Sequence, residues 1–278
     1  MASRRPEHMA PATEFYSAKG AAKYAASSRM SVIQTALATR CFELLALPPS
    51  PPALLLDIGT GTGIAGNILS DQGHHWVGSD VSENMLQKAL DDDVPGDLML
   101  ADAGDGVPFR MGCFDGAVSV SAIQWLCNAD RTEHNPWKRM NAFFATLYAA
   151  LRKSARAVLQ FYPENVAQVE LLTAAAMRAG FSGGLLVDYP NSAKAKKYFL
   201  VLTAGPPAKG VAPPKPLGVE EDSQVKVGSR RLGKRARRAQ EAVSNKDWVI
   251  SKKERRRRQG HQTKPDSKYT GRKRRVQF

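Results

Sequence analysis

Short apolar runs alternate with stretches of helical hydrophobic spacing along the first 205 residues of this chain. Apolar runs bounded by Gly, Pro, Asp or Ser are typical of buried strands, whereas apolar residues that recur every three to four positions indicate helices. The pattern predicts strands at about 53–58, 75–78, 98–101, 115–121, 156–161, 185–189 and 198–203. Between them it predicts helices at about 64–71, 83–90, 136–151 and 164–179.

The order of these elements indicates an α/β fold. Strands that alternate with helices form a mostly parallel sheet with helices on both faces. The last two predicted strands have no helix between them, so they predict an antiparallel hairpin at one edge of the sheet. Ahead of the first strand, residues 15–46 have helical spacing, and the proline cluster at 48–52 ends this region. Residues 1–12 are polar, and we expect them to be loosely held.

Charge divides the chain into two parts. Residues 206–278 contain 22 of the 40 Lys and Arg but only 7 of the 26 Asp and Glu, so the formal charge of +14 resides in this segment. A proline-rich segment with few apolar residues buries too little surface to offset the entropy of ordering. We therefore expect a folded domain over 1–205 and a disordered basic tail over 206–278. The basic clusters at 252–258 and 271–275 suit nucleic-acid phosphates, nuclear import or both, or simply solubilise the chain.

Cysteine and histidine usage predicts neither disulfides nor a metal site. Cys41, Cys113 and Cys127 are widely spaced, and the five histidines do not cluster. The longest apolar runs are too short to cross a bilayer, and the N-terminus has no signal-peptide core. We therefore expect a soluble intracellular protein without a membrane partner.

A glycine-rich turn after the first predicted strand is the strongest chemical signal. Residues 54–63 have the sequence LLLDIGTGTG, which sets a flexible backbone turn at the carboxyl end of a buried strand. The spacing Gly61-x-Gly63-x-x-Gly66 also fits a dinucleotide fingerprint. That interpretation places Asp57 against a pyrophosphate. S-Adenosylmethionine has no phosphate and carries a sulfonium and an ammonium group, so a nearby carboxylate suits it better.

Acidic residues after the next two strands extend the candidate cofactor site. Asp80 ends the second strand, where a carboxylate can accept hydrogen bonds from both ribose hydroxyls, although an acid there also suits a helix start before Ser82. Asp102 follows the third strand and can accept a hydrogen bond from the adenine amino group, while the Ala103 N–H can donate one to a ring nitrogen. The predicted cofactor-binding residues are Asp57, Gly59, Thr60, Gly61, Gly63, Asp80, Val81, Met85, Asp102, Ala103 and Ser119.

The exit of the fourth strand supplies candidates for the face that receives the methyl group. Gln124 and Trp125 follow this strand, and reactive groups in open parallel sheets gather at the carboxyl ends of strands. The indole can stack on a flat acceptor ring, and the amide can hydrogen-bond its polar edge. Trp125 fits the hydrophobic core equally well.

These motifs resemble the eukaryotic small-subunit (18S) ribosomal RNA guanine-N7 methyltransferase family. The spacing of the glycine turn resembles motif I of class I methyltransferases. The resemblance covers nearly the whole chain except about 206–243, and its most family-specific stretch is 187–197 (VDYPNSAKAKK). The other matching segments are Phe15, Tyr16, Tyr24, 28–30, Gln34, 121–129 (SAIQWLCNA), 162–165 (YPEN), 180–184 (GFSGG), 248–249, 252–255, 257–260 and 269–274. Thr60 departs from the family pattern, which commonly has cysteine there, and we expect only backbone contacts at this position.

The resemblance implies a Rossmann-like class I fold with a seven-stranded sheet, S-adenosylmethionine as cofactor, and methylation of one guanine N7 in 18S rRNA during ribosome assembly. It implies a nuclear and nucleolar location with some cytoplasmic pool. It also implies a heterodimer with a small zinc-binding methyltransferase activator subunit. By the usual methyltransferase strand order, residues 98–100 form an exposed edge strand on which that subunit docks. A nuclear import receptor is a further expected partner of the tail.

Methylation of guanine N7 needs no general base, because N7 has a free lone pair and no proton to lose. Rate enhancement is then expected from in-line placement of N7 and from a site that tolerates the charge gained by the purine. The target guanine is expected to be unpaired or flipped out. The candidates for acceptor positioning are Gln124, Trp125, Tyr162, Pro163 and Asn165. Two alternatives stay open: a small-molecule methyltransferase with an import tail, and an assembly factor whose catalysis is dispensable.

Overall fold

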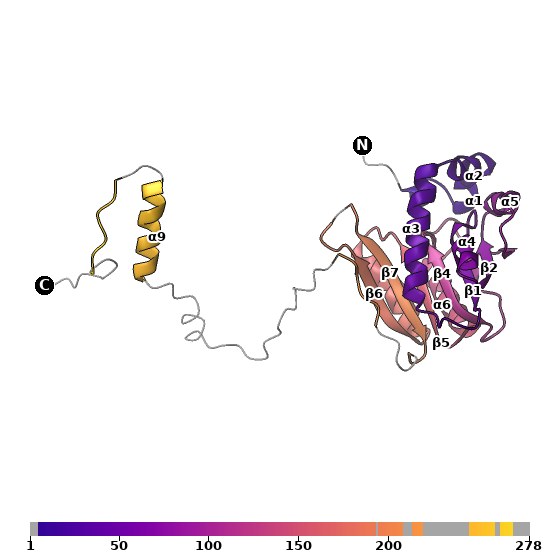
Figure 1. The fold of residues 1–278 in the computed structure, drawn as a ribbon. Coiled ribbons are helices and arrows are strands. Elements are labelled where there is room, and N and C mark those ends of the chain that lie inside the picture. Colours follow the sequence, from indigo (N-terminus) through magenta and orange to yellow (C-terminus); the bar gives the residue numbers. More distant parts are fainter. Residues whose placement is uncertain (1–4, 193, 208–212, 219–244, 259–261, 269–278) are drawn as a thin grey trace. The chain divides into compact units, whose positions relative to one another are not determined.

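A seven-stranded sheet, in the order β3-β2-β1-β4-β5-β7-β6, forms the centre of this computed structural model (Figure 1). Strands β3, β2, β1, β4 and β5 are parallel, and β7 is antiparallel to both β5 and β6. The structure describes residues 5–192, 194–207, 213–218, 245–258 and 262–268. The strands are Leu54–Ile58 (β1), His75–Asp80 (β2), Asp97–Leu100 (β3), Phe114–Val120 (β4), Leu151–Phe161 (β5), Phe181–Asp188 (β6) and Lys197–Ala204 (β7). The predicted fold class, including the antiparallel edge hairpin, is confirmed.

Helices cover both faces of the sheet and bury two apolar clusters. In β5, Ala157 and Leu159 face the cluster formed with α6 and α7, and Val158 faces the cluster formed with α3 and α4. Because both faces are covered, the central strands are continuous apolar runs. The helices are Ala12–Phe15 (α1), Ala18–Ala25 (α2), Ser28–Leu45 (α3), Ile64–Asp71 (α4), Glu83–Asp91 (α5), Pro136–Ala150 (α6) and Val166–Arg178 (α7), with short 3-10 turns at Pro6–His8 (η1), Ala103–Asp105 (η2) and Ile123–Cys127 (η3).

The N-terminal region differs from the sequence-based expectation in two ways. The predicted helical region over 15–46 is two helices, α2 and α3, preceded by α1, and α3 starts afresh where the Ser27 side chain accepts a hydrogen bond from Met30 N. Residues 5–12 are not loose. The Arg5 guanidinium donates to the backbone oxygens of Tyr162 and Pro163, both at 2.8 Å, and so ties this segment to the loop after β5.

Two strands begin earlier than their apolar runs indicate. Strand β5 starts at Leu151 rather than at 156. The apolar pattern does not show this start, because Arg152 and Lys153 are exposed and Ser154 has an irregular φ of 67°. Strand β6 starts at Phe181, and residues 182–184 pair with β7 although their serine and glycines are typical of a turn. In both strands, backbone pairing with a neighbour extends beyond the residues that bury side chains.

The first compact unit spans Met1–Glu220 and so includes residues beyond 205, among which Lys215 and Leu217 bond to the rest of the unit. Leu217 N donates to Asp188 Oδ1 at 2.8 Å, and Tyr189 N donates to Leu217 O at 2.7 Å. Arg40 bonds both the Asp188 carboxylate and Lys215 O. Since Asp188 is only 1% exposed, these contacts satisfy a buried charge.

The second unit spans Glu221–Phe278, and its described residues include one helix, α9, at Asn245–Arg258. The composition predicts disorder for this tail, and within it the structure has the helix α9. Lys, Arg and Glu are good helix formers. Lys253 and Arg257, one turn apart, both pair with Asp266, at 2.8 and 3.0 Å. The basic cluster at 271–275 lies outside the described residues.

No helix among the described residues is both long and apolar enough to cross a bilayer. Within the same ranges, His, Cys, Asp and Glu side chains do not gather in threes in a way that could hold a metal ion. The cysteines Cys41, Cys113 and Cys127 are unpaired.

Candidate cofactor and methyl-transfer site

Three glycines hold the turn after β1 in a left-handed conformation. Gly59, Gly61 and Gly63 have φ angles of 72°, 58° and 80°, which residues with a Cβ rarely adopt. A Cβ at Gly59 would also overlap the side chain of Ala122, which follows β4. The turn therefore lies directly against the exit of β4, and both segments line one cavity.

Four of the five N–H groups of this turn, residues 59–63, are hydrogen-bonded within the protein at 2.7–3.0 Å. Gly59 N and Thr60 N donate to Ser79 O, Gly61 N to Asp80 Oδ2, and Gly63 N to Thr60 O. A dinucleotide site uses free turn N–H groups to cradle a pyrophosphate. The carboxylates of Asp57 and Asp80 beside the turn would also repel phosphate. The geometry favours a cofactor without phosphate.

Asp57, in β1, organises the turn from beneath. It is 1% exposed, and its Oδ2 accepts a hydrogen bond from Thr60 Oγ1 at 2.7 Å. Burial raises the pKa of Asp57 to about 7, against the lowering effect of the Thr60 hydrogen bond. The Thr60 side chain thus supports a buried acid, a contact that the expectation of backbone contacts alone missed.

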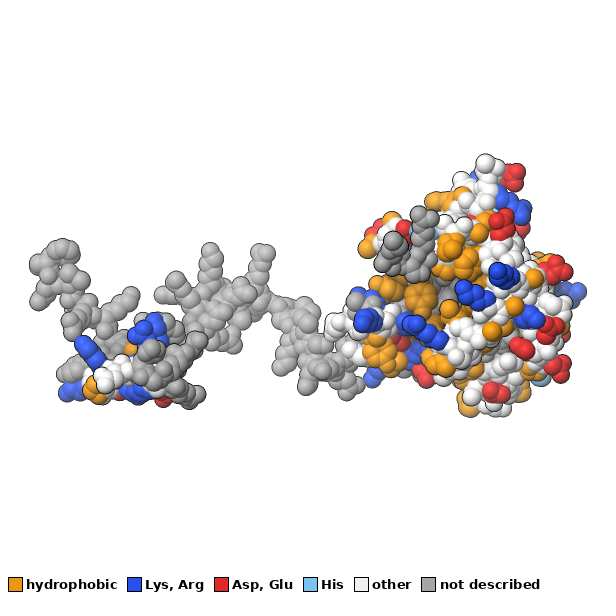
Figure 2. Space-filling model, turned by 90° about the horizontal axis from the view of Figure 1, so that it is seen from above, with side chains coloured by type: hydrophobic (Ala, Val, Ile, Leu, Met, Phe, Trp, Pro, Cys, Tyr) orange, Lys and Arg blue, Asp and Glu red, His pale blue; other side chains and the backbone are white. Residues whose placement is uncertain are grey.

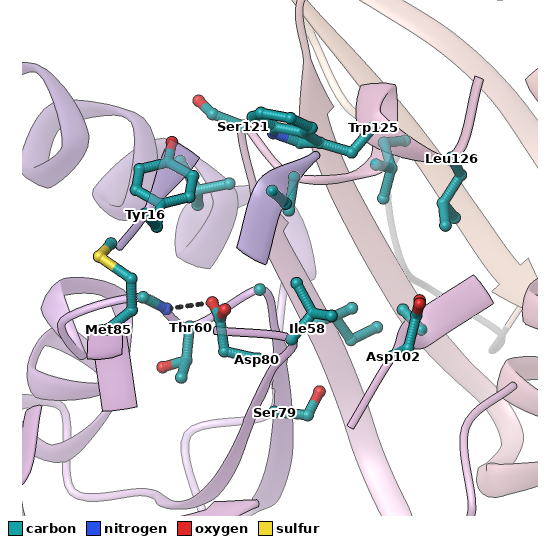
Figure 3. A pocket seen from close by; sticks show the side chains of 18 of the residues that line it. Tyr16, Ile58, Thr60, Ser79, Asp80, Met85, Asp102, Ser121, Trp125 and Leu126 are labelled. Atoms are coloured by element: carbon teal, nitrogen blue, oxygen red, sulfur yellow. Dashed lines mark hydrogen bonds between the residues drawn. The ribbon is translucent and has the colours of Figure 1, made fainter. Parts of the chain in front are cut away.

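Asp80 ends β2 with both carboxylate oxygens held by the backbone. Gly61 N donates to Oδ2 and Ser82 N to Oδ1, each at 2.8 Å, and Figure 3 shows the first of these bonds on the cavity wall. Burial raises the pKa of this carboxyl. Each oxygen keeps acceptor capacity beyond its backbone bond. Two adjacent acceptors of this kind suit the two hydroxyls of a ribose.

Asp102 lies across the cavity from Tyr16 and Met85, at the start of η2 (Figure 3). Gly104 N donates to its Oδ1 at 2.8 Å, and the Arg139 guanidinium binds both of its oxygens. Sequence reasoning found Asp102 but missed Arg139, since nothing in the local pattern of α6 connects it to a residue 37 positions earlier.

The N-terminal helices form another part of the cavity wall, which sequence reasoning also missed. Tyr16 O accepts a hydrogen bond from Ser82 Oγ at 3.0 Å. The ring centroids of Phe15 and Tyr16 lie 6.1 and 6.0 Å from the ring centroid of Trp125. Burial raises the pKa of Tyr16, and raises that of Tyr24 to about 12, so both phenols stay neutral. The available signal was the aromatic content of an otherwise polar segment.

The cavity gathers ten of the sixteen predicted site residues. The ten that line it are Asp57, Gly59, Thr60, Gly61, Asp80, Val81, Met85, Asp102, Ala103 and Trp125. The six that do not line it are Gly63, Ser119, Gln124, Tyr162, Pro163 and Asn165. Trp125 is therefore the one acceptor candidate on the cavity wall.

The remaining candidates have structural partners of their own. Ser119 is fully buried, and its hydroxyl donates to Ile58 O at 2.8 Å, which joins β4 to β1. Gln124 Nε2 donates to Ser121 O at 2.8 Å. Asn165 caps α7 by accepting from Gln168 N at 2.9 Å. These contacts account for Ser119 and Asn165 without a ligand, whereas Gln124 Oε1 is buried and has no hydrogen-bond partner among the described residues.

Known proteins resemble this chain over nearly its full length. An 18S rRNA (guanine-N(7))-methyltransferase from Mus musculus is 51% identical over 280 residues, and a probable 18S rRNA (guanine-N(7))-methyltransferase from Dictyostelium discoideum is 50% identical over 285 residues. The 18S rRNA (guanine(1575)-N(7))-methyltransferase of Saccharomyces cerevisiae is 46% identical over 275 residues. Each alignment covers 99% of this chain and 99% of the relative.

Family models and solved structures agree with these relatives. Residues 56–159 match the model described as "Methyltransferase domain", and residues 202–276 match "Methyltransferase involved in Williams-Beuren syndrome". A putative S-adenosyl-L-methionine-dependent methyltransferase from Methanococcus maripaludis has a TM-score of 0.53 at 13% identity, covering 70% of this chain and 96% of that one. Haemonchus contortus phosphoethanolamine N-methyltransferase 2 has a TM-score of 0.51 at 16% identity, covering 69% and 58%. The structural likeness confirms the fold.

The cavity fits S-adenosylmethionine, which is the cofactor of this chain. Asp80 and Asp102 offer acceptors suited to ribose and adenine, the glycine turn offers no phosphate cradle, and acidic side chains suit a cationic cofactor. The alignments, at 46–51% identity overall, extend over both the unit Met1–Glu220 and the basic tail. The chain belongs to the 18S rRNA (guanine-N7)-methyltransferase family.

Proposed function

We propose that this chain transfers a methyl group from S-adenosylmethionine to N7 of a guanine in 18S rRNA, as a step in small-subunit biogenesis. The observation that carries the proposal is a cofactor cavity with its acids in place, in a chain that aligns from end to end with 18S rRNA (guanine-N7)-methyltransferases. The relatives named for this reaction share the tail as well as the catalytic unit.

Methylation of guanine N7 does not require the protein to transfer a proton. When bound, S-adenosylmethionine supplies a methyl group on a positively charged sulfur. Held by Asp80, Asp102 and the glycine turn, the cofactor would present this methyl group to the free lone pair of N7, and sulfur would keep the electrons of the bond given up. No proton moves, so the neutral Tyr16 and Tyr24 phenols need not act as bases. The protein instead orients the acceptor and excludes water.

Trp125 is the best-placed residue to orient the guanine. It follows β4 in η3, lines the cavity, and is steadied by the Phe15 and Tyr16 rings. Figure 3 shows its indole above the level of Asp80 and Asp102, at the same end of the cavity as Ser121. A base taken out of its stack can lie on such a ring. Tyr162, Pro163, Asn165 and Gln124 remain candidates for contacts further from the cofactor.

The catalytic unit itself carries basic side chains that suit RNA. Figure 2, seen from above, shows Lys and Arg side chains among hydrophobic ones near the middle of the unit, with acidic ones mostly toward its rim. Lys197 Nζ lies 5.4 Å from the centre of the Tyr162 ring, beside the loop that Arg5 holds.

Residues 206–278 add 22 basic against 7 acidic residues. We propose that this tail contacts rRNA phosphates and carries the import signal that an import receptor reads, which gives a nuclear and nucleolar location with a cytoplasmic pool.

The small zinc-binding activator subunit is proposed to dock on β3. This strand is at the edge of the sheet, so one side of its backbone is unpaired within the sheet. Leu100 in β3 is 58% exposed and Leu90 in α5 is 59% exposed, which supplies apolar area beside that edge. An added strand from a partner would pair the backbone and cover both side chains.

Mapping N7-methylguanosine in 18S rRNA from cells with and without the protein tests the function. One modified guanine is expected to disappear with the protein and to return with the wild type, but not with a variant that no longer binds cofactor. Methyl transfer from labelled cofactor to metabolites without RNA would support a small-molecule enzyme. Normal ribosome production with the binding-deficient variant would mean that assembly needs the protein and not its catalysis.

A further inference from the structure

A charged cluster on the cavity wall joins α6 to the segment after β3. Arg139 donates through one terminal nitrogen, Nη2, to Asp102 Oδ1 at 2.8 Å and to Oδ2 at 3.1 Å. Its other terminal nitrogen, Nη1, lies 3.1 Å from His134 Nε2. All three side chains line the cofactor cavity. The cluster therefore belongs to the site and is not a surface ion pair.

The two oxygens of Asp102 carry unequal numbers of hydrogen bonds. Oδ1 accepts from Gly104 N at 2.8 Å and from Arg139 at 2.8 Å, whereas Oδ2 accepts only the longer contact from Arg139. Each carboxylate oxygen can accept about two hydrogen bonds. Oδ1 is thus filled by the protein, and Oδ2 keeps one acceptor position for a ligand.

The guanidinium has room only because residue 104 is glycine. A Cβ at Gly104 would overlap the guanidinium carbon and two nitrogens of Arg139. Gly104 is buried, and its N–H also holds Asp102. One residue therefore fixes the acid through its backbone and admits the arginine by lacking a side chain.

The same cluster has donors that no described residue satisfies. Arginine stays protonated in proteins, so Arg139 donates to His134 Nε2 and the ring proton is on Nδ1. Among the described residues, neither His134 Nδ1 nor Arg139 Nε has a hydrogen-bond partner, and both atoms are buried. Buried donors without partners are costly, which indicates that a ligand or water meets them at this end of the cavity.

We propose that Arg139 is a positioning residue that makes the cofactor site select adenine. By occupying Oδ1, it leaves Oδ2 of Asp102 as the single acceptor for the 6-amino group of the purine. The proposal rests on the proposed function only in taking S-adenosylmethionine as the ligand of this cavity, and it does not involve RNA.

The test compares two ligands by calorimetry on the full-length chain. One is S-adenosylhomocysteine, and the other is its analogue with unsubstituted purine, which lacks only the 6-amino group. The wild type is expected to prefer the first by about 10- to 100-fold, the range for a hydrogen bond to a charged group. Arg139→Gln should reduce that preference to about threefold or less by weakening S-adenosylhomocysteine while the analogue binds as before.

Two further variants make the result specific. Gly104→Ala should lower the preference in the same way, because its Cβ displaces the guanidinium without removing it. Arg178→Gln is the matched control, since Arg178 is exposed on α7 and contacts Trp137 and Asn141 away from the cavity. It should keep the wild-type preference. If Arg139→Gln does not fold, Gly104→Ala and Asp102→Asn carry the test.

Equal weakening of both ligands by Arg139→Gln or Gly104→Ala would overturn the proposal, because the arginine would then only maintain the fold. A wild-type preference in Asp102→Asn would overturn it too, because Asp102 would not be the adenine acceptor. Neither ligand can donate a methyl group and no RNA is present, so these outcomes leave guanine methylation undecided. The proposed function fails by a separate observation, an unchanged N7-methylguanosine map.

Discussion

Among single residues, the turn glycines and the buried acid beneath them carry the sharpest consequences. Gly59 combines a left-handed φ of 72° with direct contact to Ala122. Gly59→Ala should weaken S-adenosylmethionine binding at least about tenfold, because relieving the overlap moves the turn that shapes the cavity. Calorimetry measures this directly, and RNA affinity should change little.

Gly73→Ala is the control for that substitution. Gly73 has a similar φ of 81°, but a Cβ there meets nothing within 4 Å. In both variants the free energy of unfolding should fall by about 1–2 kcal/mol, because alanine is strained in a left-handed conformation. Only Gly59→Ala should lose cofactor affinity, and equal affinity in the two variants would remove the turn from the site.

Asp57 makes stability depend on pH. Its pKa rises from an ordinary 3.8 to about 7 on folding, so folding takes up a proton between these values and stability falls as pH rises through that window. Asn at this position cannot ionise and still accepts the Thr60 hydroxyl. Asp57→Asn should therefore gain stability over wild type from pH 4 to pH 7, by at least about 1 kcal/mol, and level off above pH 8.

Denaturant unfolding at a series of pH values checks this expectation. Asp97→Asn, on the exposed β3 edge, controls for the loss of one carboxylate. A constant difference between Asp57→Asn and wild type at all pH values would contradict a raised pKa for Asp57.

Among the elements, β3 is the edge strand proposed as the docking site of the activator subunit. Leu100→Asp places a charge on a side chain that is 58% exposed, so the isolated chain should fold normally. If the activator adds a strand here, this variant and Met99→Pro should both lose co-purification with it, as the charge and the missing N–H oppose pairing.

The opposite edge of the sheet supplies the matched control for that experiment. Leu185 in β6 is 39% exposed, and Leu185→Asp should leave the complex intact. A stable complex with both β3 variants, or loss of the complex with Leu185→Asp alone, would place the docking surface elsewhere.

For the whole molecule, the point at which the chain is cut decides what is lost. Truncation after Glu220 removes 20 basic and 6 acidic residues but keeps the contacts of Lys215 and Leu217 with Arg40 and Asp188. We expect this form to keep cofactor affinity and stability, to bind RNA more weakly, and to lose nuclear accumulation.

The salt dependence of RNA binding measures the contribution of the tail. Each phosphate contact on a single strand contributes roughly −0.7 to the slope of log K against log salt, so the truncated chain should show a clearly shallower slope. An unchanged slope would place the RNA surface on the catalytic unit. Truncation after Gly205 should in addition destabilise the domain, because Asp188 is buried and loses the Leu217 N–H.

Much of this protein was accessible from local sequence patterns. Continuous apolar runs predicted the strands because both faces of the sheet are covered, and the two last strands predicted the edge hairpin. The glycine spacing and the acids at 80 and 102 pointed to residues that the structure gathers in one cavity, because carboxyl ends of neighbouring parallel strands meet at one edge. The resemblance of segments such as 187–197 predicted the family, which the full-length relatives confirm.

Only the tertiary structure decided which residues complete the cavity. Ser82 bonds the backbone of the cavity residue Tyr16, 66 positions away, and Arg139 reaches Asp102 over 37 positions, contacts that no periodicity encodes. Conversely, Ser119 and Gln124 bond to the backbone around β1 and β4 rather than lining the cavity. Local patterns record which backbone forms and which face is buried. The direction and partner of a polar side chain depend on what the rest of the chain packs against it.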